Sequence, residues 1–201
     1  YTLDQSPDYF GAEKVFGDAD ATHPSHLRWI SDIDEVLPPR HKSSASVESL
    51  PESLQKAIRC YLVACAERDL RGQRDQHMSM MVNISPYNKP QHDVAFLIDD
   101  YLRKLCEEIV AFGGLGALEA ERSSSDIREL KRTWDDEYAS DSNHSWEEIC
   151  DSLVPATKDV HVIEVNSKSE DDLVYPDNRS ERVIAVGGYS LSRGLTLEGL
   201  M

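Results

Sequence analysis

The sequence has 201 residues, enough for one sizeable domain or two small ones, and its 40% hydrophobic and 29% charged residues are ordinary for a soluble globular protein. No apolar run approaches the roughly 18 residues that cross a bilayer, and Tyr1 opens a polar segment without the basic start of a signal peptide, so we expect no membrane partner. The net charge of −16 argues against a simple DNA-coating protein, because phosphate binding needs a basic surface. Much of the acid lies in 118–151 and 170–177, which leaves room for a local basic groove.

The N-terminal quarter of the chain is rich in Pro, Asp, His and Ser and shows little periodicity. We therefore expect an extended N-terminal segment over 1–48, with short helical pieces around 25–36. The run of Pro, Arg, His, Lys and Ser at 38–44 predicts a mobile loop.

The first strong element is a helix predicted over 50–71, where apolar residues recur at helical spacing. Ser49 and Glu52 have the spacing of a capping box, and Pro51 suits the first turn. Gly72 is expected to end this helix.

A strand and a second helix are predicted next. The apolar run at 78–84 favours a buried strand, and a turn at Ser85 follows it. A long helix is expected over 89–112, ended by Gly113 and Gly114. Its inward-facing residues are expected to be Val94, Leu97, Ile98, Tyr101, Leu102, Leu105 and Ile109.

The remaining elements complete the predicted fold class. Residues 114–157 are acidic, and we expect two helices there, forming a helical insertion or subdomain. The β-branched runs at 160–166 and 182–186 suit central parallel strands. Helices and strands joined in this order predict an α/β fold with a mainly parallel sheet flanked by helices.

The four cysteines, Cys60, Cys65, Cys106 and Cys150, form no CxxC pair. We interpret them as small apolar helix residues in a reducing compartment, and we expect no zinc or other metal site.

The segment 187–199 is the richest in candidate functional residues, because it is a glycine-rich run directly after a predicted strand. Such loops at the carboxyl ends of parallel strands are where α/β sheets bind ligands, and glycines let an anion approach the backbone. The alternative is a strand-to-helix turn that needs glycine for its shape alone. The segment is not a Walker phosphate loop, because no Gly-Lys pair occurs anywhere in the chain.

The run 186–200, VGGYSLSRGLTLEGL, resembles the signature of the Z1 domain found in helicase-like ATPases of bacterial restriction systems. Segments 50–54, 77–85 and 165–169 agree with that family in type and order. The family in turn is similar to the second RecA-like lobe of superfamily-two helicases, and the resemblance assigns 49–201 to that motor lobe.

The resemblance implies where ligands would bind. Residues 79–85 match the fourth helicase motif and 187–196 the fifth, so Ser85 and the loop 187–194 should lie at one edge of the sheet. Thr196 stands where many helicases place an Asp, and Gly188-Tyr189 where they often have Thr-Asp. The residues expected to contact nucleic acid or nucleotide are Ser85, Gly187, Gly188, Ser190, Ser192, Arg193, Gly194 and Thr196.

The resemblance also implies partners and a cellular setting. DNA and a nuclease subunit of the same restriction system are the expected partners, in the cytoplasm. The missing Walker loop and the absence of a starting Met suggest a fragment, which on its own should neither hydrolyse ATP nor cut DNA. ATP and Mg would be cofactors of the full-length protein only, and no residue here is expected to be catalytic.

A different class of function also fits the sequence. The acidic charge and the acidic helical segment favour a protein-interaction module that docks a nuclease subunit. A basic patch beside Ser85 and Arg193 would support DNA contact, whereas an acidic face there would support docking.

Overall fold

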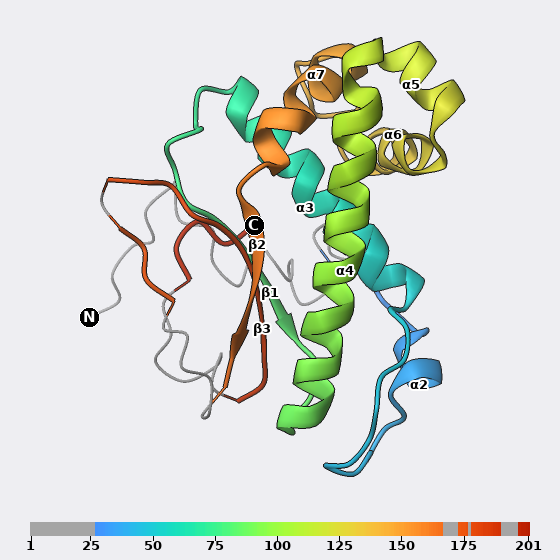
Figure 1. Ribbon diagram of the computed structural model, residues 1–201, viewed down its shortest axis with the longest axis vertical. Helices are drawn as coiled ribbons and strands as arrows, with labels where there is room; N and C mark the ends of the chain where they lie inside the picture. Colours follow the sequence, from blue (N-terminus) through green and yellow to red (C-terminus); the bar gives the residue numbers. More distant parts are fainter. Residues whose placement is uncertain (1–26, 167–172, 177, 190–196) are drawn as a thin grey trace, which may run out of the picture. The chain divides into compact units, whose positions relative to one another are not determined.

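A computed structural model of the protein describes residues 27–166, 173–176, 178–189 and 197–201. The chain divides into two compact units, Tyr1–Ser31 and Asp32–Met201. Of the first unit only 27–31 are described, and they form neither helix nor strand. The second unit holds the described helices and strands (Figure 1), which are α2 (Ile33–Val36), α3 (Glu52–Leu70), β1 (Met78–Asn83), α4 (Asn88–Phe112), the 3-10 helix η1 (Gly113–Leu115), α5 (Ala117–Ser123), α6 (Ser125–Glu137), α7 (Trp146–Thr157), β2 (Val160–Val165) and β3 (Arg182–Gly187).

The three strands form one parallel sheet in the order β1-β3-β2, which confirms the predicted α/β class with helices against a parallel sheet. Both pairings are in register, with Arg182 of β3 opposite Met78 of β1 and opposite Val160 of β2. On the far side of β1, Ser79 forms a further parallel bridge with Leu200. The central strand β3 is buried along its whole length.

The strands at 160–166 and 182–186 are both predicted to be central, which is right for β3 and wrong for β2. Among the described residues β2 pairs with β3 alone, and five of its six residues are only partly buried. Its β-branched residues Val160 and Val162 are explained by one covered face, since both pack against the helical core, whereas Ile163 points to the opposite face. A β-branched run therefore indicates burial on a face and does not distinguish a central strand from an edge strand.

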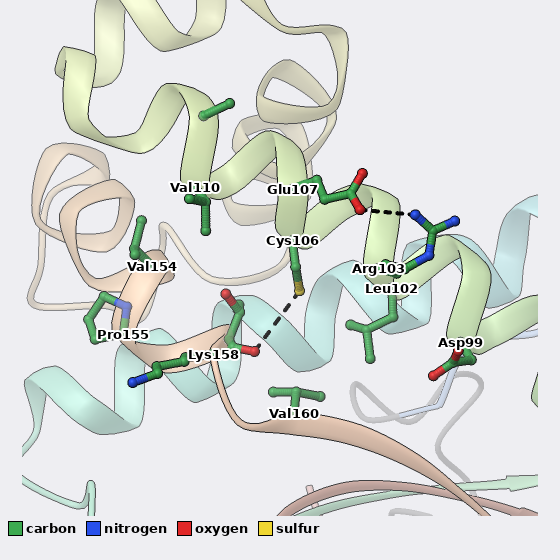
Figure 2. Close-up of a pocket in the computed structure, with 12 residues that line it drawn as sticks. Asp99, Leu102, Arg103, Cys106, Glu107, Val110, Val154, Pro155, Lys158 and Val160 are labelled. Carbon is green, nitrogen blue, oxygen red and sulfur yellow. Dashed lines mark hydrogen bonds and ion pairs between the residues drawn. The ribbon is translucent and has the colours of Figure 1, made fainter.

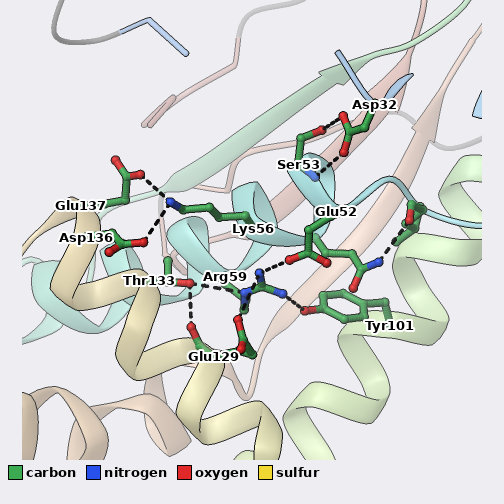
Figure 3. Close-up of polar contacts among 12 residues, drawn as sticks. Asp32, Glu52, Ser53, Lys56, Arg59, Tyr101, Glu129, Thr133, Asp136 and Glu137 are labelled. Carbon is green, nitrogen blue, oxygen red and sulfur yellow. Dashed lines mark hydrogen bonds and ion pairs between the residues drawn. The ribbon is translucent and has the colours of Figure 1, made fainter. Parts of the chain in front are cut away.

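Helix α3 begins at Glu52 with Pro51 at the N-cap, and the predicted capping box of Ser49 and Glu52 is wrong. The Glu52 carboxylate instead accepts a hydrogen bond from Arg59 at 2.6 Å. The first turn is capped from a distance, because the Asp32 carboxylate accepts from the Ser53 backbone N–H at 2.8 Å and from its hydroxyl at 2.6 Å (Figure 3). These hydrogen bonds lower the pKa of the Asp32 carboxyl.

The predicted ends of the two long helices are largely correct. Gly72, with φ of +77°, follows the last turn of α3. Helix α4 ends at Phe112 as expected, but the chain continues through η1 and reverses at Gly116, with φ of +81°. Five of the residues predicted to face inward on α4 are buried, and Leu97 and Tyr101 pack against the same core.

Residues 114–157 form three α-helices in place of the predicted two. Two side-chain caps separate them: the Ser124 hydroxyl accepts from the Ile127 N–H and starts α6, and a capping box of Ser145 and Glu148 starts α7. In Figure 1 these helices gather around one end of α3 and α4. They share one core with α3 and α4, because Leu130 and Leu153 are fully buried in the same cluster as Leu62.

A polar cluster joins the helices on the side of α3 that faces α6 (Figure 3). The buried guanidinium of Arg59 donates to Glu52, to the Tyr101 hydroxyl of α4 at 3.0 Å and to Thr133 of α6 at 3.3 Å. Lys56 on the same helix pairs with Glu137 at 2.8 Å and Asp136 at 3.3 Å. Acidic side chains of α6 are thus neutralised by cations of α3. None of the helices in the described ranges is long and apolar enough to cross a bilayer.

The start of β3 is fixed by a buried ion pair. Arg182 donates to the Asp69 carboxylate near the end of α3 and to the Ala156 carbonyl in the last turn of α7. The Asp69 side chain is 1% exposed, and its second oxygen lies 3.4 Å from Arg74 without a hydrogen bond. One guanidinium therefore holds the central strand, α3 and α7 together.

We predict that Arg182→Met destabilises the protein by about 3–5 kcal/mol, because it leaves the Asp69 carboxylate buried without its cation. Combining it with Asp69→Leu should recover a large part of that loss, since no buried charge then remains. Urea denaturation followed by circular dichroism measures both. Arg103→Met is the control, because Arg103 pairs with Asp100 and Glu107 at the surface and should cost at most about 1 kcal/mol. Equal losses for Arg182→Met and Arg103→Met would contradict this role for the buried pair.

Candidate functional site

The carboxyl edge of the sheet is the best candidate site. Because the strands are parallel and in register, Asn83 of β1 and Gly187 of β3 lie side by side where their strands end. The Ile84 N–H donates to the Gly187 carbonyl at 3.3 Å, so the contact continues into the loops. Ser85 and the start of the glycine-rich loop therefore lie at one edge, as the sequence predicts.

Gly188 is pressed against the segment that follows β1. A Cβ atom added to Gly188 would lie 2.3 Å from the Ser85 carbonyl oxygen and 2.5 Å from Nε2 of Gln91. Gln91, in the first turn of α4, donates Nε2 to that same carbonyl at 2.7 Å. Only glycine leaves room for this three-way contact. The position needs glycine for space, and this close approach brings the loop backbone next to the first turn of α4.

Gln91 leaves one polar atom without a partner. Its side chain is 2% exposed, and Oε1 has no hydrogen bond within the described ranges. A buried acceptor of this kind costs about 1–3 kcal/mol when it stays unpaired. The amide is thus an acceptor suited to an N–H or O–H donor at this edge.

The Ser85 hydroxyl connects this edge to the N-terminal segment. It accepts from the Tyr87 N–H at 3.1 Å, and Nε2 of His41 lies 2.7 Å away. The other ring nitrogen of His41 lies 3.2 Å from the Pro38 carbonyl, so Nδ1–H donates there and Nε2 accepts the Ser85 proton. The His41 ring also packs edge-on against Tyr87, with centroids 5.7 Å apart.

The Ser85–His41 pair has the donor–acceptor order of a nucleophile and its base, but its surroundings favour a structural contact. Ser85 is 3% exposed and its hydroxyl already accepts from the Tyr87 N–H, so a substrate cannot reach it. The pair holds the loop at 38–41 against the end of β1. Sequence reasoning missed His41, because 44 residues separate it from Ser85 and no local pattern links them.

Five of the predicted site residues lie outside the described part of the chain: Ser190, Ser192, Arg193, Gly194 and Thr196. Ser85, Gly187 and Gly188 are described and lie together. Glu164, near the carboxyl end of β2, pairs through its carboxylate with His92 of α4 at 3.0 Å and accepts from Asn166.

A second feature is an apolar cavity of about 940 Å³ between α4, the end of α7 and the start of β2 (Figure 2). Leu102, Val110, Val154, Pro155 and Val160 supply its apolar lining, and Arg103 and Lys158 lie at its rim. Cys106 contacts the Thr157 carbonyl, and burial raises the pKa of its thiol, which keeps it neutral. The cavity can accommodate apolar groups, and its thiol is not a reactive thiolate.

The four cysteines are free and lie on helices, as predicted. Burial raises the pKa of the Cys65 thiol to about 12 and that of Cys150 to about 11, so both behave as small apolar residues. Across the described ranges, no group of three or more His, Cys, Asp or Glu side chains is arranged to hold a metal ion.

One family model, that of the Z1 domain, matches residues 53–201. This match covers the sheet, the helices from α3 onward and the glycine-rich loop. No curated protein and no solved structure matches the chain.

We predict that Gly188→Ala destabilises the protein by about 1–3 kcal/mol, because its methyl group would collide with the backbone of Ser85. The control is Gly114→Ala, where an added Cβ meets nothing within 4 Å and should change stability by less than about 0.5 kcal/mol. Urea midpoints of the two variants make the comparison. A Gly188→Ala protein as stable as the wild type would mean that the loop and Ser85 are not in contact.

Proposed function

The chain belongs to the Z1 domain family, and on that premise we propose that it is the second motor lobe of a DNA-dependent, helicase-like translocase of a restriction system. The lobe would pair with a first lobe that carries the Walker loop, which this sequence lacks. ATP would bind between the two lobes, and its hydrolysis would move one lobe relative to the other along DNA in the cytoplasm.

The observation that carries this proposal is the contact between Gly188 and Ser85 at the carboxyl edge of a parallel sheet. In open α/β sheets, ligands bind at that edge. The two segments in contact are those that resemble the fourth and fifth helicase motifs. A motor lobe needs such a junction, because a loop that senses the nucleotide must touch the element that holds the strand.

The residues at this edge fit contact with phosphate groups. Gly187 and Gly188 let an anion approach the backbone. Arg193, which lies outside the described residues, would in this proposal offer a planar guanidinium that can bind a phosphate through two hydrogen bonds. ATP brings the phosphoryl group that is transferred, and Mg neutralises its charge. In this proposal the nucleotide phosphates and the first lobe hold that ion.

A second candidate function is the docking of a nuclease subunit, which the apolar cavity between α4 and α7 favours. Val110 is 65% exposed at this cavity although it is a large apolar side chain. Exposed apolar surface beside a hollow is typical of protein-interaction sites. The two functions use different faces of the lobe and are compatible.

We predict that Arg193→Ala, made in the full-length protein, lowers DNA-stimulated ATPase activity by one to two decades. Losing a charge-assisted contact costs about 1.5–3 kcal/mol, whereas an exposed loop substitution costs folding stability less than about 0.5 kcal/mol. ATP turnover with and without DNA is measured beside the melting temperature of each variant.

Arg122→Ala is the matched control, because Arg122 is an exposed arginine on α5, away from the sheet edge, and its loss should leave turnover unchanged. The 201-residue chain alone should show no ATPase activity above background, with or without DNA. Activity that follows the purified 201-residue chain would refute the motor-lobe proposal. An Arg193→Ala loss of turnover matched by an equal loss of stability would make Arg193 a structural residue.

For the docking candidate, we predict that Val110→Asp reduces association with the nuclease subunit at least tenfold, because a carboxylate cannot enter an apolar interface without a partner. Phe96→Asp is the control, since Phe96 is 67% exposed on the same helix but does not line the cavity. Association of the purified subunits is measured by calorimetry. Equal affinities for the two variants would exclude the cavity as the docking site.

A further inference from the structure

The loop at 38–44 is held in place at both of its ends and at its middle. Leu37 and Val47, which flank it, are buried in the core. Two backbone turns shape it, with His41 N–H donating to Pro38 at 3.2 Å and Ala45 N–H donating to Lys42 at 3.0 Å. The sequence predicts a mobile loop here, and in the structure these turns and the contact of His41 with Ser85 give its position.

That position is the carboxyl edge of the sheet. The contacts of His41 with Ser85 and Tyr87 place the loop directly beside the segment that joins β1 to α4. In Figure 1 the blue loop between α2 and α3 lies next to the first turn of α4. The residues on either side of His41, which are Arg40 and Lys42, are therefore carried to the edge where Gly188 meets Ser85.

Arg40 and Lys42 are exposed, and neither forms an ion pair with any described residue. This is notable in a chain with 37 acidic and 21 basic residues. Lys89 and Lys104, on nearby α4, each pair with an Asp one turn away. Two described acids near this edge have partners of their own: Asp93 binds Lys89 and the Val47 N–H, and Glu164 binds His92.

The backbone at Arg40 adds a second observation. Arg40 is the only described non-glycine residue with positive φ, at +60°. Such a conformation costs a non-glycine residue of order 1 kcal/mol and persists only where the surroundings impose it. Two prolines precede it, and the His41–Ser85 contact follows it, so the turn is imposed from both sides. An arginine kept where glycine or asparagine would be less strained favours a role for its side chain.

We propose that Arg40 and Lys42 bind two phosphates of a nucleic-acid strand that crosses the carboxyl edge of the sheet. This inference rests on the proposed function and adds two binding residues to its site. Arginine offers a planar fork to phosphate oxygens and lysine a point charge. The side chains of Tyr87 and Tyr189 are 39% and 67% exposed at the same edge, and aromatic rings beside cations are typical of surfaces on which bases stack.

The test measures how salt weakens DNA binding by the 201-residue chain. The probe is a fluorescein-labelled DNA with 20 base pairs and a single-stranded tail of 20 nucleotides, and fluorescence anisotropy gives its affinity at several salt concentrations. Each phosphate contact contributes about 0.7–0.9 to the slope of log affinity against log salt. Arg40→Ala combined with Lys42→Ala should therefore reduce that slope by about 1.4–1.8 and weaken binding at least roughly tenfold at low salt.

A matched control separates a local contact from overall charge. Arg122→Ala combined with Arg132→Ala removes two exposed cations from α5 and α6 and changes the net charge equally, and its slope should stay at the wild-type value. A wild-type chain that does not bind DNA overturns both the proposed function and this inference. A wild-type chain that binds, with the two double variants indistinguishable, overturns this inference alone.

A second binding measurement, with a nucleotide in place of DNA, distinguishes whether the phosphates belong to a nucleic-acid strand or to a nucleotide. Binding of a fluorescent ATP analogue to the same proteins is expected to be unaffected by the Arg40 and Lys42 substitutions. If the double variant loses the analogue and keeps DNA, the two cations serve a nucleotide, and the assignment to a nucleic-acid strand is wrong.

Discussion

The buried contact of Arg182 with Asp69 and the Ala156 carbonyl determines where the central strand begins. The positions of the residues at the carboxyl end of the sheet depend on where β3 begins. Parallel in-register pairing carries the position of Arg182 along β3 to Gly187, and the next residue, Gly188, then falls against Ser85. A slip of one residue would turn the side chains of β3 to opposite faces and move Gly188 out of the only place that fits it. The ion pair at one edge thus sets the geometry of the site at the other.

Among the described residues, several acids of the chain are paired with nearby cations or histidines. Acids of α6 pair with Lys56 and Arg59 of α3, far along the helices from Ser85. Two acids close to the edge pair with Lys89 and His92. Net charge alone therefore misrepresents the field that a ligand meets, because screening confines each pair to its neighbourhood, within about 10 Å at ordinary salt.

Local patterns in the sequence predict the elements well and their long-range contacts poorly. The apolar runs at 78–84 and 182–186 and the stripe on α4 specify strands and a helix directly, because burial leaves a periodic signature. The capping of α3 by Asp32 and the contact of His41 with Ser85 leave none, since each joins residues far apart in the chain. The boundary between α5 and α6 could have been predicted from the sequence, because Ser124 is a strong N-cap residue. The edge position of β2 depends on which strands neighbour it, and composition does not record that.

The strand order β1-β3-β2 has a consequence for how the chain is made. The two outer strands come first from the ribosome, and the strand that must lie between them is the last of the three. Roughly 100 residues separate β1 from β3 in the chain. At a synthesis rate of about 5–20 residues per second, β3 therefore appears about 5–20 seconds after β1. During that time neither β3 nor Leu200, the described pairing partners of β1, has been synthesised. Pairing over such a sequence separation is also slow, so we expect the helical layer to collapse before the sheet closes.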